Sequence, residues 1–139
     1  MARNYKKYVV YQKGYQLALD LYRLTEKFPA HEEDNLISQI RRAATSIPVN
    51  IAEGSAKKSS KEFLYFLNVA YASAKELAVL LDMSKDIGYI KKDVHRKISD
   101  QIDNFNKKIF LFIRHVEQEH IGSKFFQKYK KKLEEDSKP

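Results

Sequence analysis

The sequence predicts an all-α protein, a left-handed four-helix bundle with up-down-up-down topology. Two observations lead to this fold class. The 139 residues contain only four glycines and three prolines, so few residues interrupt a helix. Apolar residues also recur at helical spacing in four successive segments, at about 10–28, 33–54, 60–86 and 92–120. The links between these segments are short, as links between antiparallel neighbours usually are.

A chain of this length is expected to form one domain with a core that needs no disulfide or metal. It has no cysteine, which excludes thiolate zinc sites and suits a reducing compartment. Its basic first residues lead into no apolar leader segment, and no apolar run reaches the length of a membrane span. We therefore expect a cytoplasmic protein with a basic arm at residues 1–9, a bundle at residues 10–121 and a basic and then acidic tail at residues 122–139.

The first helix carries two stripes. Val10, Leu17 and Leu21 keep the 3.5-residue spacing of a bundle seam, and Pro29 ends the helix. Beside this seam lies a second stripe made of Tyr11, Tyr15, Ala18 and Tyr22. We interpret its tyrosines as packing at the rim or at a subunit interface, and base stacking is the alternative.

The second helix begins at the acidic residues 32–34, where the helix dipole favours negative charge. Its apolar face consists of Leu36, Ile40, Ala43, Ala44, Ile47 and Ile51. This face keeps its phase across Pro48, which indicates one kinked helix rather than two helices. Gly54 is expected to end it with a positive φ.

A polar ladder runs beside that apolar face and comprises Gln39, Arg42, Ser46, Asn50 and Glu53. Structurally, the ladder would be a buried or interfacial network, joined by Ser73 and Glu76, that fixes helix register. Functionally, it would contact a ligand or a nucleic acid. We favour the structural interpretation. With one carboxylate and no histidine, the ladder lacks the groups of an acid–base or nucleophilic site.

The third helix is the most apolar, and its small residues Ala70, Ser73 and Ala74 would let Ala43 and Ala44 of the second helix approach closely. Its predicted caps are Ser59 or Ser60 at the start and Gly88 at the end. The fourth helix has an unbroken seam of Ile98, Ile102, Phe105, Ile109, Phe112 and Val116. Other apolar residues lie off the seams and need to be covered by another surface, which favours a homo-oligomer; examples are Tyr11, Tyr15, Phe110 and Ile113. After Gly122 we expect a partly helical, fraying tail.

Residues 39–54, Gln-Ile-Arg-Arg-Ala-Ala-Thr-Ser-Ile-Pro-Val-Asn-Ile-Ala-Glu-Gly, resemble the hallmark of a protein family encoded in intervening sequences of bacterial 23S ribosomal RNA genes. The flanking Phe28-Pro29 and Lys61-Glu62-Phe63 stand in the expected order, so the resemblance covers roughly residues 10–116. The accessory protein of diversity-generating retroelements is similar to the same family. This resemblance implies a four-helix bundle, a homopentamer and nucleic-acid association without known catalysis. Tyr11 and Gly14 replace an expected tryptophan and alanine.

The formal net charge of +8 is concentrated at the two ends of the chain, whereas the bundle body is nearly neutral. In an up-down-up-down bundle, both termini and the link between the second and third helices lie at one end. The basic residues expected to meet there and to bind phosphates are Arg3, Lys6, Lys7, Lys57, Lys58, Lys61, Lys124, Lys128, Lys130, Lys131 and Lys132. Glu32, Glu33 and Asp34 mark the opposite end. Interleaved aromatic residues would add base stacking.

These patterns favour a non-enzymatic RNA- or DNA-binding homo-oligomer. The alternative is an interaction scaffold, or an accessory subunit that docks a partner such as a reverse transcriptase. We expect no cofactor and no metal site, because His31, His95, His115 and His120 are isolated and no phosphate-binding loop is present.

Overall fold

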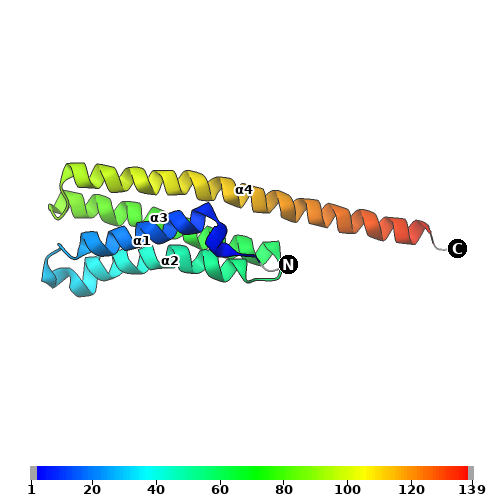
Figure 1. The fold of residues 1–139 in the computed structure, drawn as a ribbon, viewed down its shortest axis with the longest axis horizontal. Helices are drawn as coiled ribbons and strands as arrows, with labels where there is room; N and C mark the ends of the chain where they lie inside the picture. Colours follow the sequence, from blue (N-terminus) through cyan, green and yellow to red (C-terminus); the bar gives the residue numbers. More distant parts are fainter. Residues whose placement is uncertain (1–2, 138–139) are drawn as a thin grey trace.

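The computed structural model describes residues 3–137, which contain four long helices and no strand. The helices are α1 (Val9–Thr25), α2 (Ser38–Ser55), α3 (Ser60–Ile87) and α4 (Lys92–Asp136). A short 3-10 helix, η1 (Tyr5–Lys7), precedes α1. A second 3-10 helix, η2 (Ala30–Glu32), and a π-helix, η3 (Glu33–Ile37), precede α2. Successive helices run in opposite directions (Figure 1), and each packs against the next, with α1 also touching α4. The predicted all-α, up-down-up-down four-helix bundle is confirmed.

One continuous core follows the bundle axis, and all four helices contribute fully buried side chains such as Leu17, Ile47, Leu67 and Phe105. Near the end of the core, α4 buries Ile113 and leaves Phe112 half-buried. A strict heptad repeat drifts by about 20° per heptad relative to a straight α-helix, so the core-facing position moves on by one residue. Ile113 therefore belongs to the core, and its prediction as an off-seam residue was wrong.

The link between α1 and α2 differs from the predicted boundaries. α1 ends at Thr25, earlier than the expected residue 28, and Phe28 packs outside the helix against Tyr89, with ring centroids 5.5 Å apart. Pro29 contributes to this early end, because it has no N–H to donate to the Thr25 carbonyl four residues earlier and its ring clashes with that carbonyl in a helix. The Glu32 carboxylate accepts a hydrogen bond from the Leu36 N–H at 3.3 Å, which confirms the acidic start of the second helix.

α2 passes through Pro48 without a break, as predicted, but Gly54 does not end it. Among residues 3–137 only Gly88 has a positive φ, 100°, and it is the predicted C-cap of α3. Gly54 instead lies where α3 comes close. A Cβ atom added there would lie 2.7 Å from Phe66 Cβ and 2.9 Å from Phe63 Cδ1. Close packing, rather than backbone conformation, accounts for this glycine.

α4 continues to Asp136 instead of ending near residue 120. Gly122 sits in open space inside this helix, and a single exposed glycine costs only about 1 kcal/mol relative to alanine. Every residue from 121 to 136 is exposed. This segment, which we call the α4 extension, projects past the rest of the bundle as a single helix (Figure 1). The expected change at Gly122 therefore marks the end of packing rather than the end of the helix.

By length and composition alone, α3 is apolar enough to cross a membrane. In the bundle, one side of α3 fills the core with residues such as Leu67 and Leu77. Its opposite side exposes four large apolar residues, which we call the α3 stripe: Tyr65, Val79, Met83 and Ile87. Core packing accounts for the first side, and the α3 stripe is left facing outward.

We predict that Gly54→Ala lowers the free energy of unfolding by about 1 kcal/mol. Overpacking against α3 costs about 1–3 kcal/mol, which outweighs a gain of about 1 kcal/mol in helix propensity. Urea unfolding followed by circular dichroism measures the difference. The matched control is Gly122→Ala, which adds the same methyl group in open space and should not destabilise the protein. Equal stability of the two variants would show that Gly54 is not needed for the approach of α3.

Candidate nucleic-acid interface

Residues 3–8, part of the predicted basic arm, are docked on the end of the bundle. The Arg3 guanidinium lies 4.7 Å from the centroid of the Phe63 ring and donates to the Lys57 carbonyl oxygen at 2.6 Å. The Tyr8 ring packs against Phe112, with centroids 4.9 Å apart. Burial raises the pKa of the Tyr8 hydroxyl, and the nearby Arg3 cation only partly offsets this rise. The phenol therefore stays neutral at physiological pH.

The docked arm and the α2–α3 turn enclose a hollow of about 730 Å³, which we call the basic hollow. Its lining consists of Arg3, Tyr5, Ala52, Ser55, Ala56, Lys57 and Lys58. Three of these residues are cationic and none is acidic, so the hollow presents positive potential to an anion. The Lys57 ammonium also lies 5.1 Å from the centroid of the Phe66 ring, which holds it at the rim of α3.

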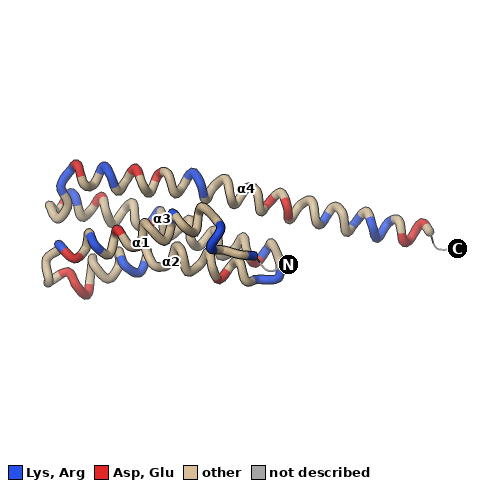
Figure 2. Tube along the Cα trace, in the orientation of Figure 1, with Lys and Arg blue, Asp and Glu red and all other residues tan. Residues whose placement is uncertain are grey.

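The other predicted basic residues share this end of the molecule but not the basic hollow. Lys6 and Lys7 belong to η1, and Lys61 belongs to the first turn of α3. The remaining lysines lie along the α4 extension: Lys124, Lys128, Lys130, Lys131 and Lys132. Figure 2 shows basic residues at the arm, at the α2–α3 turn and along the extension, with acidic residues near the start of α2 at the opposite end. The basic end therefore has two separate parts, a hollow and a rod.

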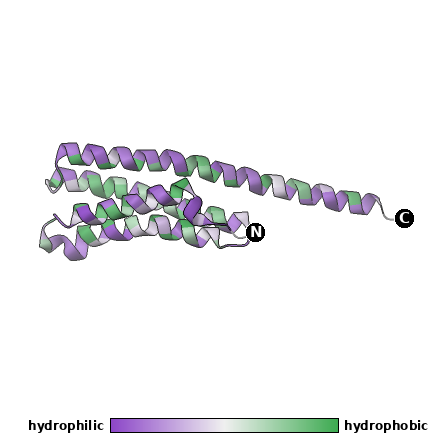
Figure 3. Ribbon diagram, in the orientation of Figure 1, coloured by the Kyte–Doolittle hydropathy of each residue, from purple (hydrophilic) through white to green (hydrophobic). Residues whose placement is uncertain are grey.

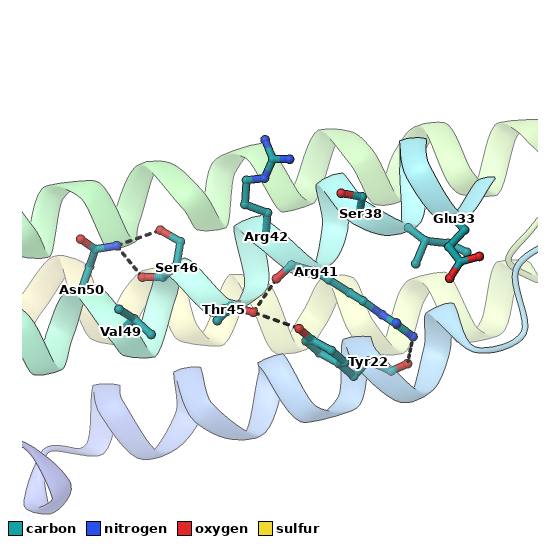
Figure 4. A pocket seen from close by; sticks show the side chains of 10 residues that line it. Tyr22, Glu33, Ser38, Arg41, Arg42, Thr45, Ser46, Val49 and Asn50 are labelled. Carbon is teal, nitrogen blue, oxygen red and sulfur yellow. Dashed lines mark hydrogen bonds between the residues drawn. The ribbon is translucent and has the colours of Figure 1, made fainter.

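The polar ladder is half-buried at its centre and exposed at its ends. The Ser46 and Ser73 hydroxyls lie 2.8 Å apart and join α2 to α3. The Asn50 amide donates to the Ser46 hydroxyl at 2.9 Å and to the Ser46 carbonyl at 2.7 Å (Figure 4). Gln39 donates to Asn35, one turn earlier, at 2.9 Å.

The other members of the ladder are exposed side chains. Arg42, Glu53 and Glu76 make no side-chain hydrogen bond or ion pair with any residue between 3 and 137. The prediction of a continuous buried network is therefore wrong for these three residues, and their place at a subunit interface stays a prediction. The ladder reduces to one interhelical contact at Ser46, with solvent-facing residues on either side of it.

Arg41, which the sequence patterns did not single out, connects α2 to the end of α1. Its guanidinium donates to the Thr25 hydroxyl at 2.9 Å and to the Tyr22 carbonyl at 3.2 Å. It also lies 4.7 Å from the centroid of the Tyr22 ring. A cation beside the last turn of α1 also interacts favourably with the negative end of that helix's dipole. One feature of the sequence could have pointed to Arg41: it follows the apolar Ile37 by one helical turn, so it lies on a side of α2 that faces another helix.

Two open hollows flank Thr45 on the outer side of α2. One, of about 650 Å³, has Glu33, Arg41 and Arg42 in its lining, and in Figure 4 the two arginines point in different directions. The other, of about 300 Å³, lies between α1 and α2, and we call it the tyrosine groove. It is lined by Tyr11, Tyr15, Ala18, Leu19, Tyr22, Thr45, Pro48, Val49 and Ala52. Burial raises the pKa of the Tyr11 hydroxyl, so this phenol is uncharged at physiological pH.

The histidines form separate pairs. His95 Nε2 lies 2.8 Å from the Asp82 carboxylate, and His115 Nε2 lies 3.2 Å from that of Glu119. Between residues 3 and 137, no three histidine or acidic side chains come together in a way that could hold a metal ion. Burial, with the neighbouring Glu32, raises the pKa of the Tyr89 hydroxyl, which lies 3.3 Å from His31 Nε2.

The four-helix fold and the cluster of basic residues at one end of it define a class of protein, a small helical bundle with a basic end. The profile of the 23S rRNA-intervening sequence protein family matches residues 6–110, and the chain belongs to that family. A protein of unknown function from the S23 ribosomal protein family of Bacteroides thetaiotaomicron VPI-5482 has a similar structure, with a TM-score of 0.70 and 29% sequence identity. The match covers 76% of this chain and 96% of that one. No curated protein matches the chain.

We predict that Ser73→Ala lowers the free energy of unfolding by about 1 kcal/mol, because it leaves the half-buried Ser46 hydroxyl without its partner on α3. Arg42→Ala is the control and should leave stability unchanged within about 0.5 kcal/mol, as expected for an exposed side chain. Both values come from urea unfolding at neutral pH. Equal effects of the two substitutions would contradict the difference in structural role between the centre of the ladder and its exposed members.

Proposed function

We propose that this protein is a non-enzymatic, cytoplasmic, homo-oligomeric nucleic-acid-binding protein that contacts phosphates through its basic end. The observation that carries the proposal is the position of three basic segments at one end of a nearly neutral bundle. The basic hollow offers Arg3, Lys57 and Lys58, and the α4 extension offers a row of lysines. Cations grouped in this way favour a polyanion, and membership of a family named for an rRNA intervening sequence is consistent with RNA or DNA.

Binding through phosphates predicts a specific salt dependence. Each phosphate neutralised releases counterions, so the logarithm of the affinity should fall linearly with the logarithm of the salt concentration. The slope should be about −0.9 per phosphate on a duplex and about −0.7 on a single strand. Replacing Lys128, Lys130, Lys131 and Lys132 with glutamine should flatten this slope and weaken binding. Helicity and oligomer size should not change, because these residues touch no core.

A charge-matched control separates location from total charge. Replacing Lys85, Lys91, Lys92 and Lys97 with glutamine removes the same charge near the opposite end of the bundle, where α3 ends and α4 begins. This variant should keep the slope of the unmodified protein in a fluorescence-anisotropy titration over a series of salt concentrations. Equal slopes for both variants would mean that the basic end has no special role in phosphate contact.

Two exposed apolar faces support the proposed oligomer, which the resemblance suggests is a pentamer. The first is the tyrosine groove, where Tyr15 is 49% and Val49 is 45% exposed. The second is the α3 stripe, where Val79 is 59% exposed. Because α1 and α3 lie on a diagonal of the bundle, these faces point to different sides. Two different faces that bind each other form a heterologous interface, which closes into a ring when the rotation between subunits allows it.

Light scattering of the unmodified protein should give several times the 16.3 kDa of one chain. Tyr15→Lys in the groove and Met83→Lys in the stripe should each give monomers, because a buried lysine blocks its face. An equal mixture of the two variants should give heterodimers, since each variant keeps the face that the other has lost. Isologous pairing predicts instead that one of the two variants assembles normally. A monomeric unmodified protein would overturn the proposed oligomer.

A further inference from the structure

The α4 extension contains a repeated basic–apolar dipeptide. The pairs are His120-Ile121, Lys124-Phe125, Lys128-Tyr129 and Lys132-Leu133, one pair every four residues. On an α-helix, neighbours in sequence are separated by about 100°, and each repeat advances by about 6 Å. The extension therefore has a basic row and an apolar row that run beside each other, and Figure 3 shows hydrophobic positions recurring among hydrophilic ones along it.

The apolar row does not continue the core of the bundle. Val116 is the last buried residue of α4, and Ile121 follows it by five positions, about 140° around the helix. Along the row, Phe125 is 73% and Tyr129 is 55% exposed. The family profile ends at residue 110, so this surface lies outside the part of the chain that the family shares. The α4 extension therefore needs a partner of its own.

The pairing of lysine with an aromatic residue favours single-stranded over double-stranded nucleic acid. A duplex offers its phosphates to lysines but keeps its bases stacked inside, so Phe125 and Tyr129 would stay in water. A single strand offers phosphates and unstacked base faces together. Base–aromatic stacking tolerates any sequence, because every base has a flat face. The apolar row thus adds affinity only when the bases are free.

We infer that the α4 extension is a binding site for single-stranded nucleic acid, in which Phe125 and Tyr129 stack on bases while Lys124, Lys128 and Lys132 contact the phosphates. This inference rests on the proposed nucleic-acid-binding function and adds the class of strand to it. The other occupant to be tested is a second copy of the chain, which would cover the apolar row through hydrophobic contact.

The first test compares a labelled RNA strand of mixed sequence with its duplex, at one salt concentration and with the full-length protein. The single strand should bind more tightly. Phe125→Leu and Tyr129→Leu should each weaken single-strand binding about fivefold or more and leave duplex binding unchanged. Leucine keeps an apolar side chain, so a contact between subunits would tolerate these substitutions, whereas base stacking requires the ring. Phe125→Tyr should retain single-strand binding.

The matched control is Phe110→Leu. Phe110 is 50% exposed and lies on α4 before the extension begins, away from the lysines of the α4 extension. It should not change binding. The chain has no tryptophan, so Tyr129→Trp introduces a single indole as a direct reporter. Its fluorescence should be quenched by the single strand through stacking, and not by the duplex.

The outcomes separate the two proposals. Equal affinity for strand and duplex, with no effect of either leucine substitution, would overturn the single-strand site and leave phosphate binding intact. A decrease in oligomer size after Phe125→Ala with unchanged affinity for the strand would assign the apolar row to a second copy. Absence of binding to either probe would overturn the proposed function together with this inference.

Discussion

The close approach of α2 and α3 is the constraint on which the rest of the structure depends. Ala43 and Ala44 of α2 are buried, as are Ala70 and Ala74 of α3, so small residues from both helices lie in the core. The missing side chain of Gly54 extends this approach to the end of the pair. Small side chains allow helix axes to come near one another, and the remaining volume is filled by the larger residues of α1 and α4. The width of the bundle follows from this pair.

The same contact fixes the helices along their length. The Ser46–Ser73 hydrogen bond joins the middle of α2 to the middle of α3, and it sets their register where the neighbouring alanines offer little shape for interlocking. With the register fixed, the α2–α3 turn and the Phe63 ring lie next to each other, and the Arg3 guanidinium packs on that ring. The basic hollow therefore depends on the packing of α2 against α3 rather than on its own charges, which repel each other.

The sequence predicts the four helices well because apolar spacing and caps are local signals. Ser59 and Gly88 bound α3 as expected, and the apolar face of α2 crosses Pro48 in phase. The errors come from features that depend on distant residues. Gly54 looks like a helix end until Phe63 and Phe66 are seen beside it. Neither the drift of the seam to Ile113 nor the length of α4 beyond its last core contact is a property of any short window.

The candidate site also has a part that the sequence predicts and a part that depends on distant residues. Topology alone places the basic segments at one end, because alternating helices return the chain there. The basic hollow could not be predicted, since it needs Arg3 to find the Lys57 carbonyl and the Phe63 ring, and residues 3–8 have no helical periodicity. Arg41 was missed for a similar reason, because its partners are on the last turn of α1.

The bundle also accounts for the existence of the α4 extension as an ordered rod. An isolated helix of this length is marginal in water, because its first turn is costly to form. Continuation from packed residues such as Ile109 and Val116 removes that nucleation cost, so residues 121–136 only need to propagate an existing helix. The apolar row nevertheless remains in water until a partner covers it, which costs free energy in the unbound protein. A partner that binds the extension therefore gains from a surface already held at a fixed spacing, and it pays little of the ordering entropy that a disordered tail would require.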